Sequence, residues 1–197
     1  MTKTSPRPTE HDIAPLFSER WSPRAFTDEP ISGADLYAAF EAARWAPSAR
    51  NVQPWRFVYA RKGTPAFDEF VGVLWERNQV WVRNAAALVF ILSKKTFVFE
   101  GEEKPLRSHS FDAGAAWISF ALQAGLKGWS THALGGFDND KAREVLGVPD
   151  DFEVEIGIAI GRRGDKAQLP PDLQALETPK PRLPLAELVS EGRFSGK

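Results

Sequence analysis

The stretch from residue 46 to residue 55 concentrates polar side chains between two apolar segments. It contains Pro47, Ser48, Ala49, Asn51 and Gln53. The amides of Asn and Gln donate and accept hydrogen bonds at once, which suits the edge of a heteroaromatic ring. Loops carry function more often than core elements do, so this stretch indicates a ring-binding loop. An ordinary turn bounded by its two prolines is the alternative.

A second group of residues suits phosphate or an electron-rich carbonyl. Arg20, Trp21, Ser22 and Arg24 surround Pro23, which disfavours a helix and predicts that the two guanidinium groups are displayed from an extended segment. A guanidinium group can bind phosphate through two parallel hydrogen bonds. A solvated basic turn is the alternative.

Two further groups lie later in the chain. Leu134 precedes Gly135 and Gly136, where backbone without a Cβ can approach a planar ligand closely. A loop that leads into the next helix is the alternative there. Near the C-terminus, Gly161 and Arg162 are followed by Lys180 and Arg182 in proline-rich surroundings, which offers positive charge to a phosphate. A structural tail with ordinary surface charges is the alternative.

Taken in order, the four groups resemble the signature of the FMN-dependent nitroreductase family, over about residues 10–190. The resemblance implies that Arg20 and Ser22 hold the FMN phosphate and ribityl chain, that Arg24 lies near N1 and O2 of the ring, and that Lys180 and Arg182 bind the phosphate. It implies that the loop lines FMN, often from the other subunit, and that the Gly135 backbone faces N5. The complete set of implied cofactor contacts is Arg20, Trp21, Ser22, Arg24, Pro47, Ser48, Ala49, Asn51, Gln53, Leu134, Gly135, Gly136, Gly161, Arg162, Lys180 and Arg182.

The chain departs from the family pattern at three positions. Trp21 stands where many members have Arg or an imidazole, and Ala133 and Leu134 precede Gly135 where many have Pro or an acidic residue. His132 is outside the pattern, and we place it in a substrate pocket together with Phe97 and Phe99.

The resemblance implies an NAD(P)H-dependent FMN oxidoreductase without a catalytic side chain. NAD(P)H reduces the flavin and leaves, and a nitroaromatic, quinone or similar planar acceptor then takes its place, which is a ping-pong mechanism. A flavin-dependent dehydrogenase or enal reductase, and a non-catalytic FMN-binding dimer, are alternatives. A plain α+β binding domain without flavin is a further alternative.

Composition removes several other classes of function. The 197 residues hold 25 Lys and Arg against 26 Asp and Glu, so nucleic acid is not a favoured partner. There is no cysteine, and the three histidines lack metal-ligand spacing, so we expect no thiol chemistry and no metal. Dinucleotide-binding, P-loop and nucleophile-elbow motifs are absent. The N-terminus lacks an apolar signal core and the longest apolar run is too short for a bilayer, so we expect a cytoplasmic protein without membrane contact.

The elements that position these residues are predicted to form one α+β domain over residues 10–197, after a disordered extension over 1–9. The family resemblance implies that a mostly antiparallel sheet is surrounded by helices. The predicted elements are a short helix at 13–20, a helix capped by Ser32, a strand at 55–61, a helix opened by Pro65, a fully covered strand at 85–92, a mobile loop at 94–107, a helix at 111–126, a helix capped by Asp138 and a strand at 152–160. In the last strand, Phe152, Val154, Ile156 and Ile158 are expected on one face.

The helix at 111–126 is apolar almost all round, so it must be buried on every side. We expect a second subunit to cover part of it, and the family resemblance implies a homodimer with FMN at the interface. A central helix in a monomeric core is the alternative. Beyond residue 164 only 185–189 is expected to be ordered, as part of a tail that lies across the partner. The loop at 94–107, with Phe97 and Phe99, is expected to roof the pocket.

Overall fold

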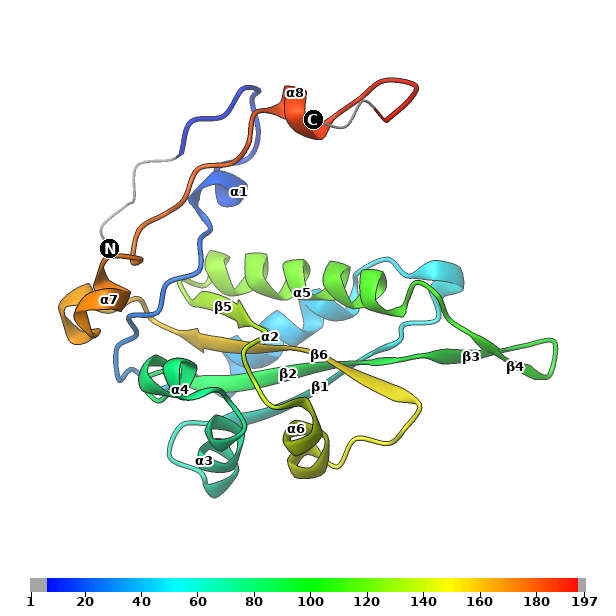
Figure 1. Ribbon diagram of the computed structural model, residues 1–197, viewed down its shortest axis with the longest axis horizontal. Helices are drawn as coiled ribbons and strands as arrows, with labels where there is room; N and C mark the ends of the chain where they lie inside the picture. The colour runs from blue at the N-terminus through cyan, green and yellow to red at the C-terminus, as the bar shows by residue number, and fades with distance from the viewer. Residues whose placement is uncertain (1–6, 195–197) are drawn as a thin grey trace.

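Four antiparallel strands form the centre of the fold in the computed structural model, which describes residues 7–194. The strand order is β1 (Trp55–Arg61), β2 (Ala87–Lys94), β6 (Phe152–Gly161) and β5 (Ser130–Leu134). Strand β2 is buried along its whole length apart from Lys94, as its unbroken apolar run predicts. The α+β class and the antiparallel sheet are therefore confirmed (Figure 1).

Helices cover both faces of the sheet. Helices α2 (Gly33–Arg44) and α5 (His109–Leu126) pack on one face, and α3 (Pro65–Gly72), α4 (Glu76–Val82) and α6 (Asn139–Leu146) pack on the other (Figure 1). The predicted caps are present: the hydroxyl of Ser32 accepts from Asp35 N at 3.0 Å, and the Asp138 carboxylate accepts from Lys141 N at 3.1 Å.

The segment from 94 to 107, predicted to be a mobile loop, is instead a β-hairpin. Strands β3 (Thr96–Phe99) and β4 (Glu102–Pro105) pair through a turn at Glu100 and Gly101, whose φ angles are 54° and 82°. Two successive positive φ angles are typical of a two-residue hairpin turn. The hairpin extends beyond the end of the main sheet (Figure 1).

The face predicted for Val154 in β6 is wrong. Ile156 pairs with Ile91 but Val154 pairs with Leu92, so Glu155 is an extra residue that forms a bulge. The bulge reverses the alternation of side chains. Val154 and Phe152 consequently pack with α3, α4 and α6, whereas Ile156 and Ile158 face α2 and α5.

Two arms leave the sheet beside each other. The N-terminal arm includes α1 (Pro15–Glu19), and the C-terminal arm includes α7 (Pro171–Gln174) and α8 (Leu185–Leu188), of which α7 was not predicted. The arms are joined where Arg7 Nη1 donates to Lys180 O at 2.8 Å and Leu185 N donates to the Glu10 carboxylate at 2.9 Å. Figure 1 shows them rising together above α5. Of the segment expected to be disordered, residues 1–6 lie outside the described residues.

Candidate functional site

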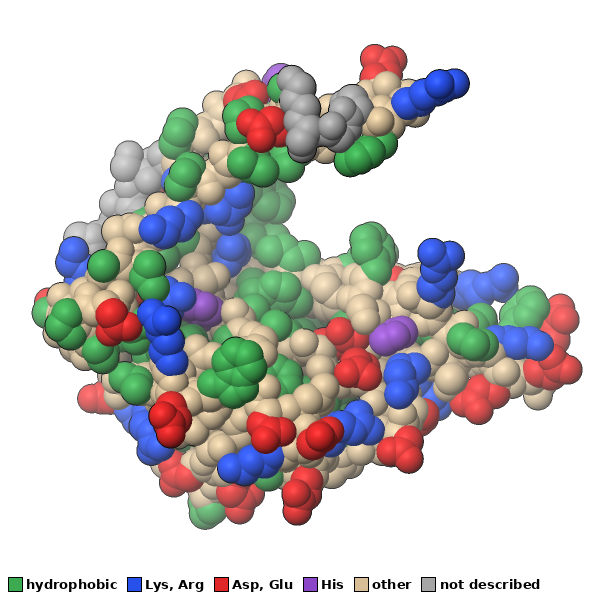
Figure 2. All heavy atoms as spheres, viewed as in Figure 1, with side chains coloured by type: hydrophobic (Ala, Val, Ile, Leu, Met, Phe, Trp, Pro, Cys, Tyr) green, Lys and Arg blue, Asp and Glu red, His purple; other side chains and the backbone are tan. Residues whose placement is uncertain are grey.

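A cationic pocket of about 260 Å³ lies where the two arms join the sheet. It is lined by residues from the N-terminal arm, β5 and the C-terminal arm, namely Arg7, Arg20, Trp21, Ser22, Arg24, His132, Leu176, Thr178, Lys180 and Arg182. Lys180 and Arg182 of the fourth predicted group therefore meet the first group, although about 160 residues separate them in the chain. Arg20 Nη1 donates to Ser22 Oγ at 3.3 Å. Figure 2 shows Lys and Arg side chains gathered over this region.

Positive charges crowd this pocket. Burial lowers the pKa of Arg20, and the neighbouring guanidinium groups of Arg182 and Arg7 lower it further. Within residues 7–194, no ion pair joins Arg20, Arg24 or Arg182 to a carboxylate. The pocket is therefore suited to a multiply charged anion such as a phosphate monoester.

Glu177 fixes the backbone of the N-terminal arm at the pocket. Its buried carboxylate accepts from Arg24 N at 2.8 and 3.0 Å and from Ala25 N at 2.9 Å. These contacts span more than 150 residues of sequence and set the direction in which the Arg24 side chain leaves the backbone. The sequence did not reveal Glu177, because a single acidic residue in a proline-rich tail carries no spacing signal.

His132 lies against the floor of the pocket as a neutral imidazole. Its Nδ1 lies 3.0 Å from Pro23 O, which can only accept, so Nδ1 carries the proton. Burial lowers the pKa of His132 to about 4, and the charges of Arg24 and Arg20 act in the same direction. The ring packs on Trp81 of α4, with centroids 4.6 Å apart. The structure thus brings His132 to the predicted cofactor residues rather than to Phe97 and Phe99.

Gly135 and Gly136 follow β5 on the side of the sheet that α4 covers. Gly136 O accepts from Trp75 N at 3.0 Å and from Asn78 Nδ2 at 3.0 Å. A Cβ on Gly136 would collide with the Asn78 amide, whereas one on Gly135 would meet only Ile156 Cδ1, at 3.8 Å. Gly136 is therefore required for the contact with α4. The backbone at Gly135 has open space beside it, into which a ligand can approach.

The loop from Pro47 to Gln53 holds an unusual backbone. Arg50, Asn51 and Gln53 have φ angles of 52°, 54° and 52°, a region that residues other than glycine adopt at a cost. The loop is held by Ser48 Oγ, which accepts from Gln53 N at 3.0 Å. It is also held by Ala49 N, which donates to Asp112 Oδ2 at 3.1 Å. Backbone strain of this kind clusters at binding sites.

This loop lies far from the cationic pocket of the same chain. It contacts Asp112 at the start of α5, whereas Trp21 of the pocket lines a hollow together with Leu126 at the end of α5. Fourteen helical residues at 1.5 Å each place these ends roughly 20 Å apart. A single chain therefore does not bring the two halves of the predicted site together.

The β3–β4 hairpin lies at the same end as the loop. The Arg50 guanidinium stacks on the Phe99 ring at 4.4 Å, and Phe97 and Phe99 contact each other. Within one chain, Phe97 and Phe99 therefore lie at the end of α5 away from the cationic pocket, and their role as the roof of a pocket stays a prediction. Their position follows from the hairpin, which continues the direction of β2 away from the arms (Figure 1).

Gly161, the last residue of β6, and Arg162 serve local packing in this structure. A Cβ on Gly161 would come within 2.7 Å of the Phe26 ring. Arg162 donates to Lys127 O at 2.7 Å and to Glu29 at 3.1 Å, and stacks on Trp129 at 4.0 Å. The structure does not bring Arg162 into the cationic pocket. It lines the neighbouring hollow of about 620 Å³ between α1 and α5.

Comparison with known families decides the identity of the fold. The model of the nitroreductase family matches residues 17–162. The chain belongs to the nitroreductase family. This confirms the family that the four groups of residues resemble. Among residues 7–194, no cluster of potential metal ligands and no helix able to span a membrane is present.

Solved structures and curated relatives extend this result. A crystal structure described as an oxidoreductase containing FMN is 49% identical, covers 100% of both chains and has a TM-score of 0.95. A nitroreductase-like protein from Desulfovibrio desulfuricans, crystallised with FMN, is 27% identical over 94% of this chain and 99% of its own, with a TM-score of 0.72. MhqN of Bacillus subtilis, which is named as an NAD(P)H nitroreductase, is 27% identical and covers 79% of this chain and 90% of its own.

Proposed function

We propose that this nitroreductase-family protein is an FMN-dependent oxidoreductase that uses NAD(P)H to reduce planar acceptors such as quinones and nitroaromatics by a ping-pong mechanism. The observation that carries the proposal is the cationic pocket formed by Arg20, Ser22, Arg24, Lys180 and Arg182. Its support from outside the chain is that two solved relatives contain FMN. Bound FMN would supply the redox chemistry, accepting a hydride from NAD(P)H and delivering electrons to the acceptor.

The donor set of the pocket fits the phosphate end of FMN. Arg20, Lys180 and Arg182 offer positive charge and N–H donors, and Ser22 adds a hydroxyl. Arg24, whose backbone Glu177 fixes, would donate to the electron-rich N1–O2 edge of the ring. The backbone at Leu134, Gly135 and Gly136 would face N5, where the open side of Gly135 leaves room for a planar ring.

The other half of the site would come from a second copy of the chain. Pro47, Ser48, Ala49, Asn51 and Gln53 lie roughly 20 Å from the pocket of their own chain, and their loop faces solvent. In a homodimer with the two α5 helices packed against each other, this loop would reach the pocket of the partner. The Asn51 and Gln53 amides would then pair with the polar edge of the ring.

Helix α5 carries the apolar stripe that such a dimer needs. Phe111 is 83% exposed, Ile118 38% and Leu126 69%. With Leu122 they recur at intervals of seven and four residues, which places them on one side of the helix, opposite the buried side that carries Ala113, Ala116, Phe120 and Ala124. An exposed apolar stripe of this length marks a protein–protein interface. We also propose a cytoplasmic location, because the reaction draws on the NAD(P)H generated there.

The first experiment is an absorption spectrum of the purified protein, followed by identification of the released chromophore and by addition of NADPH or NADH without oxygen. The proposal predicts FMN that is bleached by at least one nicotinamide and restored by 1,4-naphthoquinone. A bound flavin that neither nicotinamide bleaches would indicate a non-catalytic FMN-binding dimer. A colourless protein that also fails to bind added FMN would contradict the proposal.

A matched pair of variants tests the role of Arg24. Arg24→Ala should slow reduction of the bound flavin in stopped-flow measurements, because positive charge at the N1–O2 edge stabilises the reduced anion. Arg83→Ala, an exposed change at the end of α4, should leave the rate unchanged. Equal rates in the two variants would remove Arg24 from the site.

A further inference from the structure

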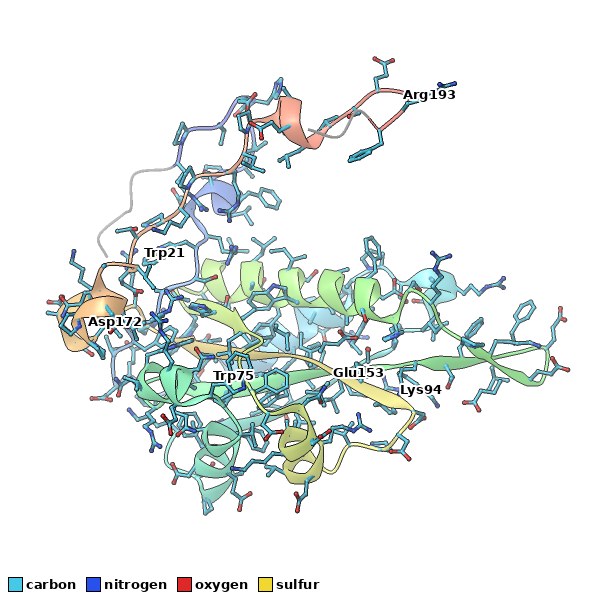
Figure 3. The ribbon with its side chains drawn as sticks, viewed as in Figure 1. Trp21, Trp75, Lys94, Glu153, Asp172 and Arg193 are labelled. Carbon is cyan, nitrogen blue, oxygen red and sulfur yellow. The ribbon has the colours of Figure 1, made fainter. Side chains whose placement is uncertain are left out.

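Trp75 places a large apolar side chain in solvent. It is the N-cap residue of α4 and is 64% exposed, whereas Trp81 on the same helix is buried. The family resemblance assigns no role to Trp75. Figure 3 shows it between α4 and the segment that links β5 to α6.

The indole lies directly against the glycines that follow β5. A Cβ built on Gly136 would come within 3.1 Å of Trp75 Cε3, so the ring covers this backbone. Trp75 N also donates to Gly136 O at 3.0 Å. Trp75 is therefore adjacent to the segment that would face N5 of the flavin.

Several contacts hold Trp75 in this place. Leu74 forms a β-bridge with Phe137, and Asp138 N donates to Val73 O at 2.9 Å. Further along α4, the Trp81 ring packs on His132 at the floor of the cationic pocket, and Trp81 Nε1 donates to Asn78 Oδ1 at 3.3 Å. The same short helix thus reaches the pocket through Trp81. It contacts Gly136 through Trp75 and Asn78. The position of the exposed indole is therefore tied to the position of the site.

We propose that Trp75 is the specificity-determining residue that contacts the planar electron acceptor at the mouth of the site. A rigidly anchored indole offers an apolar face on which a quinone or nitroaromatic ring can stack. Its polarisable face discriminates planar aromatic acceptors from compact anionic ones, which gain nothing from stacking. The proposal rests on the proposed function, since it requires an electron acceptor to approach beside Gly135 and Gly136.

Steady-state kinetics of the FMN-loaded enzyme test this role with two acceptors. For 1,4-naphthoquinone, Trp75→Ala should raise KM about three- to tenfold and change kcat by less than about twofold, as expected for the loss of one aromatic contact. For ferricyanide, KM should be unchanged. Trp75→Phe should restore most of the affinity for the quinone. Trp45→Ala removes a tryptophan that is 75% exposed at the end of α2 and should behave as wild type.

A fluorescence measurement adds a readout that is independent of turnover. Naphthoquinone added to the oxidised holoenzyme should quench tryptophan emission, and Trp75→Phe should lose part of this quenching whereas Trp45→Phe should keep it. An unchanged quinone KM in Trp75→Ala, or an equal rise for both acceptors, would overturn the proposal. Both tests are made on a wild-type enzyme that binds FMN and reduces quinone. If the proposed function itself fails, the wild-type protein lacks flavin or activity, and this result is distinct from an unchanged quinone KM in the Trp75→Ala variant.

Discussion

Two groups that do not themselves carry positive charge determine how the cationic pocket is shaped. Glu177 binds the backbone N–H groups of Arg24 and Ala25, and neutral His132 binds the carbonyl of Pro23. Both therefore act on the same three-residue segment, Glu177 through its N–H donors and His132 through its carbonyl acceptor. The direction of the Arg24 side chain depends on these contacts, because a buried backbone group without a partner is costly.

Glu177→Ala should destabilise the protein by roughly 1–3 kcal/mol, since it leaves two backbone donors at the pocket without their acceptor. It should also weaken FMN binding, because the segment that carries Arg24 loses its anchor. Glu177→Gln keeps one acceptor oxygen and should lose less stability and less affinity for FMN than Glu177→Ala. Urea unfolding and FMN titration of the two variants measure this, and an Ala variant as stable as the Gln variant would contradict it.

His132 should make the protein less stable in mild acid. Its pKa in the folded protein is about 4, below its ordinary value of 6.5, so the unfolded chain binds the proton more readily between these values. Stability should therefore be fully present above about pH 6.5 and fall as the pH approaches about 4. His132→Asn should flatten this pH dependence in urea unfolding at pH 7 and pH 5. His11→Asn, an exposed change, should preserve it.

The residue types at the pocket were predictable, but their supporting contacts were not. Arg20, Ser22 and Arg24 are close in sequence and form a recognisable pattern with Lys180 and Arg182. Glu177 has no such neighbours, and its role depends on a tertiary contact that only the folded chain creates. For the same reason, sequence alone did not show that Arg162 is engaged by Glu29, Lys127 and Trp129.

At the scale of elements, helix α4 links the glycines after β5 to the core. Trp75 N and Asn78 Nδ2 donate hydrogen bonds to Gly136 O, and the Trp81 ring packs on His132. This helix was not predicted, because its seven residues are too few for a helical repeat to stand out. The bulge at Glu155 was hidden for a related reason, since a bulge changes which face a residue occupies without changing residue type.

Gly136→Ala should disturb this link and Gly135→Ala should not. The new Cβ at 136 would displace the Asn78 amide, which would then lose its bonds to Gly136 O and Trp81 Nε1. We expect a loss of about 1–3 kcal/mol in Gly136→Ala. At Gly135 the added methyl group meets Ile156 at an ordinary distance of 3.8 Å. Denaturant unfolding compares the two variants, and equal stabilities would contradict the role given to α4.

At the scale of the whole molecule, the two halves of the predicted FMN site lie at opposite ends of α5. The caps, the central strand and the long helix were predicted because each follows from a local repeat or a capping residue. The path of the arms was not, because proline-rich segments carry no periodicity and their course depends on contacts such as that between Arg7 and Lys180. The arms rise above α5 (Figure 1). A second copy of the chain would cover the apolar stripe of α5 and complete the FMN site.

Ile118→Asp should prevent dimer formation, because it places a charge in the middle of the apolar stripe of α5. The monomer should then bind FMN much more weakly, since each pocket loses the loop of its partner. Val80→Asp changes an apolar residue on α4 that is 50% exposed, more than Ile118, and should leave the dimer intact. Sedimentation velocity with FMN absorbance measures both properties, and a monomeric Ile118→Asp protein with full FMN affinity would contradict the shared site.

The most direct measurement of the central claim is FMN binding by mixed dimers. Arg20→Ala/Arg182→Ala disables the cationic pocket, and Asn51→Ala/Gln53→Ala disables the loop. Each variant alone should bind FMN poorly. A dimer that contains one copy of each, purified by two different tags, has one intact site and should bind one FMN with wild-type affinity. A mixed dimer that binds FMN no better than its two parents would contradict a site built from the pocket of one subunit and the loop of the other.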